Sequence, residues 1–229
     1  MTLTFSLSGI TEAQKRIREK GKNLFSVPSS YCIIDIETTG LSPDFDSIIE
    51  VSAVKYVDGK EVGNFTSLIK PEETYDDGTY IDDFIEKLTG ITNEMLSTAP
   101  DPMPVFKQFK DFIGENILIG HNVNFDINFL YDNFEHYLSE KLDNDFVDTM
   151  RFSRFLHPEE AHHRLEDLAE RYKIDYSGAH RSLNDCYITH ACYEHLQEEM
   201  IQSSGSLDSF IDSWKKHKRG LKATDIQAS

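Results

Sequence analysis

The chain has 229 residues, of which 39% are apolar and 11% aromatic, enough for one α/β domain with short appendages. It contains no apolar run long enough to span a bilayer and no secretory signal, so we expect a cytoplasmic protein with no membrane partner. A formal net charge of −17 excludes a protein that coats nucleic acid through a broad basic surface. The three cysteines form no CxxC pair, which favours free thiols in a reducing compartment.

Charge is distributed unevenly along the chain. Residues 11–23 carry a net charge of +3 and residues 203–229 a net charge of +2, which leaves −22 for residues 24–202. Any nucleic acid would therefore be held locally, through metal ions and a few contacts. The expected segments are a basic N-terminal helix (11–24) with a linker (together 1–30), a folded domain (31–200) and a basic C-terminal tail (201–229).

An apolar, β-prone run from Tyr31 to Ile34 predicts a buried central strand. Asp35 and Glu37 follow directly, and because strand side chains repeat every two residues, both carboxylates project from the same face. Two like charges side by side repel each other, and a hard cation such as Mg²⁺ or Mn²⁺ with oxygen ligands relieves that repulsion. The alternative is a strand end that reaches solvent, where both acids are simply hydrated.

The patterns that follow indicate the fold. Residues 47–57 alternate in polarity, which predicts a half-buried strand, and Asp58-Gly59 predicts a hairpin to an antiparallel strand over 61–70. Further apolar spacing predicts short strands at 117–119 and 146–149, and helices at 81–88, 105–113, 125–134, 165–172 and, roughly, 179–200. Three antiparallel strands followed by parallel strands that alternate with helices predict an α/β fold with one mixed sheet and helices on both faces.

Asp126 follows the predicted strand at 117–119 and belongs to the first turn of the next helix. Ligands of open α/β sheets gather at the edge where strands lead into helices, so this carboxylate is a candidate metal ligand. The alternative is that Asp126 only complements the helix dipole, and the local pattern by itself favours that interpretation.

Asp185 lies in the long last helix, on the same face as Ile188, Cys192 and Leu196. A carboxylate on a buried helix face is rare unless it is paired or binds metal. Arg181 is the only helical cation near it, so metal binding is favoured over a structural ion pair. His180 begins the helix, where it could overhang a site that Asp185 lines; a lone histidine there is otherwise structural or exposed.

Taken together, Asp35-x-Glu37, the segment from His121 to Asp126 and His180-x4-Asp185 resemble the DEDDh (DnaQ-like) 3′→5′ exonucleases. The resemblance is to the group that includes the proofreading epsilon subunit of bacterial DNA polymerase III, and it runs from about Tyr31 to Met200. It implies a ribonuclease H-like fold and a two-metal exonuclease. By resemblance, the metal ligands are Asp35, Glu37, Asp126 and Asp185, and the general base is His180.

The implied chemistry explains these residue types. Hydrolysis of a phosphodiester requires an activated water and relief of charge on the attacked phosphate and on the leaving oxygen, which two divalent cations supply. Four carboxylates balance the charge of two Mg²⁺ or Mn²⁺ ions. A histidine titrates near neutral pH, so His180 can accept the proton of the water.

The resemblance also implies substrate contacts. Thr38 and Leu41 match positions that line the terminal nucleotide, with Leu41 as a wedge against the base. His121, Asn122 and Phe125 match residues beside the same pocket, although Leu41 and Phe125 could equally belong to the core. Asp148 could support the site from behind, but a helix cap is the favoured interpretation. Many relatives have a histidine at the pocket rim where this chain has Thr89.

We therefore expect a two-metal-ion 3′→5′ exonuclease that releases nucleoside monophosphates from a single-stranded or frayed 3′ end of DNA, alone or in proofreading or repair. The alternatives are an RNA-directed exoribonuclease and a non-catalytic nucleic-acid-binding scaffold. The tail is a candidate docking segment for a DNA polymerase or repair protein, because Leu207, Phe210, Ile211 and Trp214 recur at helical spacing. The alternative is a packed or frayed terminal helix.

Overall fold

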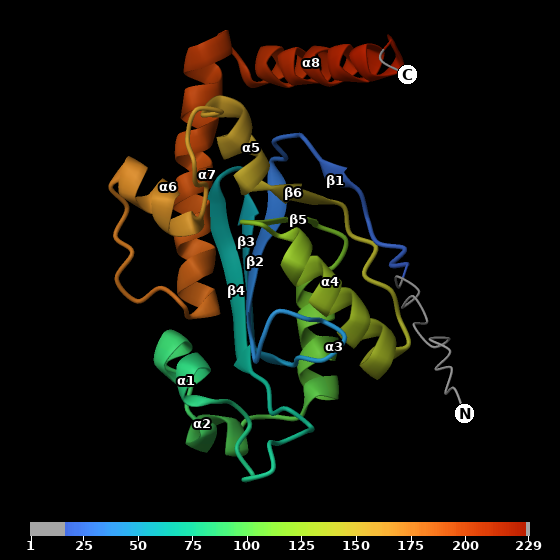
Figure 1. Ribbon diagram of the computed structural model, residues 1–229, viewed down its shortest axis with the longest axis vertical. Coiled ribbons are helices and arrows are strands. Elements are labelled where there is room, and N and C mark those ends of the chain that lie inside the picture. Colours follow the sequence, from blue (N-terminus) through green and yellow to red (C-terminus); the bar gives the residue numbers. More distant parts are fainter. Residues whose placement is uncertain (1–16, 228–229) are drawn as a thin grey trace, which may run out of the picture.

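The computed structural model describes residues 17–227, and for residues 218–227 it describes the helical backbone only. One mixed sheet with the strand order β1-β6-β5-β2-β3-β4 forms its centre (Figure 1). β2, β3 and β4 are antiparallel, whereas β5 runs parallel to β2, β6 to β5 and β1 to β6. The strands are β1 (Asn23–Leu24), β2 (Ser30–Thr38), β3 (Ile48–Val57), β4 (Lys60–Leu68), β5 (Ile117–Gly120) and β6 (Phe146–Asp148).

Helices cover both faces of the sheet, as the sequence predicted. α3 and α4 lie on one face, and α5, α6 and α7 lie on the other (Figure 1). The helices are α1 (Asp83–Thr89), α2 (Asn93–Ser97), α3 (Pro102–Ile113), α4 (Asn124–Asn133) with a π-helical turn η1 (Phe134–Leu138), α5 (Thr149–Leu156), α6 (Leu165–Tyr172), α7 (Ser182–Ser204) and α8 (Leu207–Gln227). α2 and α5 were not predicted, because each is short, and the strand predicted over 146–149 includes Thr149, where α5 begins.

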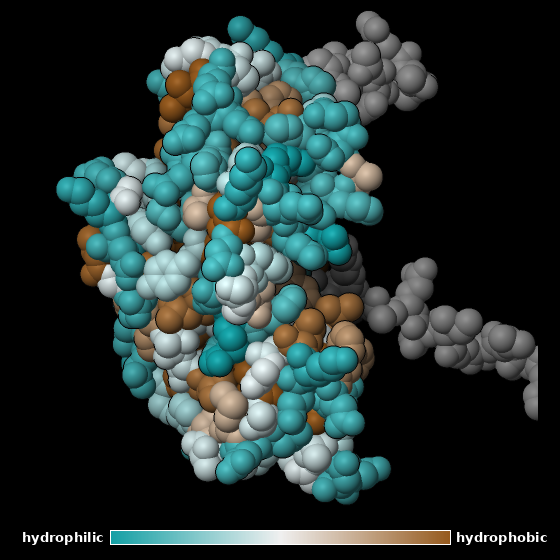
Figure 2. Space-filling model, turned by 90° about the vertical axis from the view of Figure 1, so that its left-hand side faces the viewer, coloured by the Kyte–Doolittle hydropathy of each residue, from teal (hydrophilic) through white to brown (hydrophobic). Residues whose placement is uncertain are grey.

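The side chains of β2 divide between two apolar cores. Cys32, Ile34 and Ile36 pack toward α3 and α4, while Tyr31 and Ile33 pack toward α5, α6 and α7. The three cysteines are buried and unpaired, as predicted. The surface over α6, α7 and α1 carries small hydrophobic areas scattered among hydrophilic ones (Figure 2). In the described part of the chain, no helix is both long and apolar enough to cross a membrane.

The predicted half-buried character of β3 is wrong. Every residue from Ile48 to Val54 is buried, including Glu50 and Ser52 on the face that was expected to meet solvent. The reason is that the start of α7 covers this face and supplies hydrogen-bond partners to both polar side chains. The hairpin after β3 forms as predicted, with Asp58 and Gly59 both at positive φ.

The N-terminal segment also differs from the prediction. Residues 11–16 of the expected helix lie outside the described residues, residues 17–22 are not helical, and the last two residues, Asn23 and Leu24, form strand β1. Residues 17–22 run along α4 instead, where Arg18 binds Asp132 and Lys20 donates to Asn128 (2.6 Å). Gly21 passes so close to the backbone of residue 144 that a Cβ would lie 1.9 Å from its carbonyl oxygen. Contacts with acceptors on α4 therefore override the helical propensity of these basic residues.

The C-terminal residues pack against the chain itself. Trp214 stacks on Phe25 with ring centroids 4.1 Å apart, and Phe210 is buried in the same core. α8 lies across the far end of α7, at the end of the sheet opposite to α1 and α2 (Figure 1). The apolar spacing that motivated the docking hypothesis is thus accounted for by contacts within the chain.

Candidate active site

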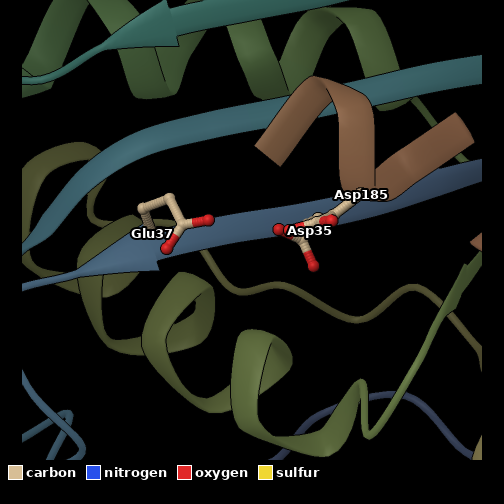
Figure 3. Close-up of side chains that lie close together, drawn as sticks. All are labelled: Asp35, Glu37 and Asp185. Atoms are coloured by element: carbon tan, nitrogen blue, oxygen red, sulfur yellow. The ribbon is translucent and has the colours of Figure 1, made fainter. Parts of the chain in front are cut away.

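Asp35 and Glu37 lie where β2 approaches its C-terminal end, on the face that packs against α7. Figure 3 shows both carboxylates on this strand, with Asp185 reaching them from the first turn of α7. One ligand oxygen from each of the three residues lies within 4.8 Å of the others. This separation allows a single cation to contact all three side chains.

Asp185 carries an unsatisfied buried atom. Asp185 is 6% exposed, and its Oδ2 accepts a hydrogen bond from the backbone N–H of His180 at 2.9 Å. Its Oδ1 is buried and has no hydrogen-bond partner among the described residues. Buried polar atoms are almost always paired, so an unpaired carboxylate oxygen on a residue of this three-acid group fits a cation-binding site.

Asp126 lies in the first turn of α4 and is buried. It does not belong to the group of three, but the backbone N–H of Ile36 stabilises its carboxylate, which places it against β2 between the positions of Asp35 and Glu37. Its charge also helps to raise the pKa of Asp35. Its carboxylate is therefore part of the acidic cluster, beyond any effect on the helix dipole.

Without a bound cation, burial and mutual repulsion make the acids of the cluster harder to ionise than ordinary carboxyl groups. Burial raises the pKa of Glu37 to about 8, that of Asp126 to about 8 and that of Asp185 to about 6. Burial first, and then the neighbouring carboxylates, raise the pKa of Asp35 well above its usual range. Bound divalent cations would reverse this effect, because they stabilise the ionised form of every ligand.

His180 is close to the cluster, but it is not part of the helix. Its backbone is left-handed (φ 64°), and α7 begins at Ser182 with Arg181 as its N-cap, so the predicted helical start near Ala179 is wrong. The angular relation to Asp185 expected within a helix therefore does not apply. The link between the two residues is the hydrogen bond from the His180 N–H, and the imidazole packs edge-on near the ring of Tyr176.

Known proteins resemble this chain in sequence and in fold. The family model RNase_T, described as exonuclease, matches residues 32–193, which include the acidic cluster and all strands of the sheet except β1 and the first residues of β2. The chain belongs to this exonuclease family. The match confirms the resemblance to the DEDDh exonucleases that the sequence suggested.

Relatives of this exonuclease include much longer proteins. The PolC-type DNA polymerase III of Latilactobacillus sakei is 41% identical over 175 residues, covering 76% of this chain and 12% of the polymerase. That of Bacillus subtilis is 38% identical over 161 residues, covering 70% of this chain and 11% of the polymerase. The chain thus spans about an eighth of the length of these relatives.

Solved structures support the ribonuclease H-like fold of this exonuclease. Exonuclease X in complex with 5′ overhanging duplex DNA has a TM-score of 0.59 and 25% identity, covering 80% of this chain and 98% of that one. E. coli Exonuclease I in complex with a dT13 oligonucleotide has a TM-score of 0.64 and 20% identity, covering 76% of this chain and 42% of that one. The second likeness concerns the fold alone.

Sequence reasoning missed one polar group at the site of this exonuclease. Glu50 is 2% exposed and lies directly opposite Glu37 in the β2–β3 pairing. Its carboxylate accepts from the Arg181 guanidinium (2.6 Å) and from the backbone N–H of Ser182 (2.8 Å). Glu50 therefore anchors the first turn of α7, which carries Asp185. It also forms an ion pair with Arg181, the side chain that could otherwise have paired with Asp185. The signals in the sequence were a glutamate at a polar position of the alternating run and a minor match of Ile48-Ile49-Glu50 to the DEDDh family, which assigned it no role.

The residues expected to contact substrate have mixed environments. Leu41 is 85% exposed, so the alternative that it belongs to the core is wrong. Phe125 is partly buried and packs on Phe129, with ring centroids 4.8 Å apart. Thr38 lies at the end of β2, where its hydroxyl donates to the carbonyl of Gly40.

His121 and Asn122 are engaged inside the exonuclease. The carbonyl of His163 can only accept, so Nε2 of His121 carries the hydrogen (2.6 Å). Nδ1 of His121 lies 2.9 Å from the Thr149 hydroxyl, which also lies 3.1 Å from the carbonyl of Gly120. Burial lowers the pKa of His121 to about 4, which keeps the ring neutral. Asn122 has a left-handed backbone (φ 58°), and its N–H donates to Asp148, whose side chain also caps α5 as expected.

Proposed function

We propose that the chain is a metal-dependent 3′→5′ exonuclease that releases nucleoside 5′-monophosphates from a 3′ end of DNA. The observation that carries the proposal is the orphaned Oδ1 of Asp185, which faces Asp35 and Glu37 in a member of an exonuclease family. A hard divalent cation matches this all-oxygen donor set better than any softer metal.

Four carboxylates are assigned to metal binding in this proposal: Asp35, Glu37, Asp126 and Asp185. Two bound Mg²⁺ or Mn²⁺ ions would supply charge stabilisation for the attacking and leaving oxygens of the phosphodiester. The residues themselves hold the ligand oxygens in place, because β2 and the first turns of α4 and α7 are fixed by packing on both faces of the sheet.

His180 is assigned as the general base. Its partly buried ring lies directly before α7, and its own N–H is tied to Asp185. A neutral imidazole can accept the proton of the attacking water. Removal of a positioned general base typically lowers kcat by about 10²- to 10⁴-fold.

The proposed substrate is a single-stranded or frayed DNA end. It is supported by the relatives, which are named as DNA polymerases, and by the Exonuclease X structure, which is described as a DNA complex. Within this proposal the chain acts alone or in proofreading beside a DNA polymerase. A polymerase partner would need a surface other than the apolar face of α8, which contacts Phe25 and Phe155.

The test is degradation of a DNA oligomer labelled at its 5′ end, with Mg²⁺ or Mn²⁺. We expect a ladder that shortens from the 3′ end, is abolished by EDTA, and is lost in Asp126→Asn and His180→Ala. Asp111→Asn, which removes an exposed carboxylate on α3 far from the cluster, is the matched control and should leave the ladder unchanged. Rapid loss of a matched RNA oligomer with DNA intact would identify an exoribonuclease, and survival of both would leave the scaffold interpretation.

A further inference from the structure

The loop over residues 39–47 joins β2 to β3 directly after the acids of β2. It carries two of the most exposed large apolar side chains in the described part of the chain, Leu41 at 85% and Phe45 at 91%. Leu41 was expected to contact the terminal nucleotide, whereas nothing so far accounts for Phe45. An aromatic ring held in water contributes little to folding, so the ring of Phe45 is available to a partner.

The exposure of Phe45 is built into the loop. The carboxylate of Asp46 accepts from the backbone N–H of Ser42 (2.8 Å), and the N–H groups of Phe45 and Asp46 donate back to the Ser42 carbonyl (3.0 and 2.8 Å). Gly40 passes so close that a Cβ there would lie 2.5 Å from the Asp46 carboxylate. Hydrogen bonds between residues 39 and 47 close the base of the loop. The ring of Phe45 thus projects from a closed turn.

A second contact fixes the loop relative to the acidic cluster. Arg18 binds Asp132 at the end of α4 and lies 3.4 Å from Asp44 in the loop. Because α4 also carries Asp126, this bridge ties the exposed turn to an element of the candidate site. Leu41 and Phe45 are therefore presented by a fixed loop that directly follows the acids of β2 and is tied to the helix that carries Asp126.

The charges around Phe45 select among partners. Asp44 and Asp46 flank Phe45, and Asp35 and Glu37 lie on the strand before the loop, whereas Arg18 offsets only the charge of Asp44. A phosphate would therefore be repelled from this turn unless metal ions were bound beside it. A nucleobase offers an uncharged π face that stacks on an aromatic ring whatever its sequence. The partner that fits an exposed phenylalanine on an acidic turn is a base with its phosphate directed elsewhere.

We propose that Phe45, beside Leu41, is a stacking surface for unpaired bases near the 3′ end of the strand that is cleaved. The inference rests on the proposed function and adds a residue that recognises the substrate. Phe45 takes no part in the chemistry. Its role is to hold the strand while the terminal nucleotide is positioned at the acids.

The test compares Phe45→Ala with the wild-type protein on single-stranded oligothymidylate and on the same oligomer with abasic residues at the second to fourth positions from its 3′ end. Base stacking of this strength corresponds to an increase in KM of about 5- to 100-fold for Phe45→Ala on the normal oligomer, with little change in kcat. On the abasic oligomer the two proteins should have the same KM, because the partner of the ring is missing. Phe45→Tyr should restore the wild-type KM.

Phe84→Ala is the matched control, because Phe84 is 68% exposed on α1 and is not in this loop. An unchanged KM for Phe45→Ala with an active wild-type protein would overturn the stacking proposal and leave the exonuclease intact. An equal rise in KM on both oligomers would also overturn it. So would the finding that the wild-type protein is a dimer that the Phe45→Ala substitution dissociates, because Phe45 would then be a subunit contact. An inactive wild-type protein would instead refute the proposed function.

Discussion

Asp126→Asn should stabilise the metal-free protein while it abolishes activity. The carboxylate is buried beside Asp35, and burial raises the pKa of Asp126 to about 8. Asparagine has the same shape and keeps an oxygen for the N–H of Ile36, but it carries no charge. The substitution therefore removes the free-energy cost of a buried carboxyl group, which must either hold its proton or be paired with a bound cation.

The magnitude follows from proton linkage. Between about pH 4 and pH 8 the folded protein keeps a proton on Asp126 that the unfolded chain has lost, so each unit rise in pH lowers the free energy of unfolding by about 1.4 kcal/mol. Near pH 8 the accumulated penalty is about 5 kcal/mol, which is a large part of the stability of an ordinary domain. His121 has the opposite effect, because its pKa is lowered to about 4 and only the unfolded chain binds a proton there between about pH 4 and pH 6.5. Above pH 6.5 this ring is neutral in both states, so it no longer changes the free energy of unfolding.

The assay is urea unfolding in EDTA at pH 6.5, 7.25 and 8. We expect the free energy of unfolding of Asp126→Asn to exceed that of the wild-type protein, with a gap that widens as the pH rises. Adding Mg²⁺ at pH 8 should stabilise the wild-type protein more than the variant. Asp111→Asn should behave as wild type throughout. Equal stabilities with parallel pH slopes in EDTA would refute the electrostatic argument.

Two further substitutions test how the site and the tail are held. Glu50→Ala should lower the free energy of unfolding, measured in urea, by about 2–4 kcal/mol, because it leaves the Ser182 N–H and Arg181 without their acceptor. Glu50→Gln keeps an acceptor oxygen and should lower it less. Equal losses of stability in the two variants would show that the acceptor is not what matters. Trp214→Ala should cost about 2 kcal/mol through lost stacking on Phe25 but leave kcat unchanged, and a fall in kcat would contradict the separation of α8 from the acids.

Local patterns were sufficient for the parts of the site that follow a strand or helix period. Asp35 and Glu37 share a face because a strand repeats every two residues, and the buried face of α7 identified Asp185 before its partners were known. The order of strands also predicted the mixed sheet, since hairpin and crossover signals are short-range.

The remaining features depend on contacts between distant segments. Glu50 was assigned to a solvent-facing row of β3, but Arg181 and Ser182 come from residues more than a hundred positions away and make its burial favourable. The basic residues near Arg18 have helical propensity, yet acceptors on α4 hold them in an extended path. Neither outcome could be read from a window of neighbouring residues.

The most direct test of the central claim is a crystal structure with Mn²⁺ and a nucleoside 5′-monophosphate. We expect two anomalous peaks about 3.5–4 Å apart, surrounded by Asp35, Glu37, Asp126 and Asp185, with one of them in contact with the Oδ1 of Asp185. The absence of any peak among these four carboxylates at saturating Mn²⁺, or ions bound only elsewhere, would contradict the account.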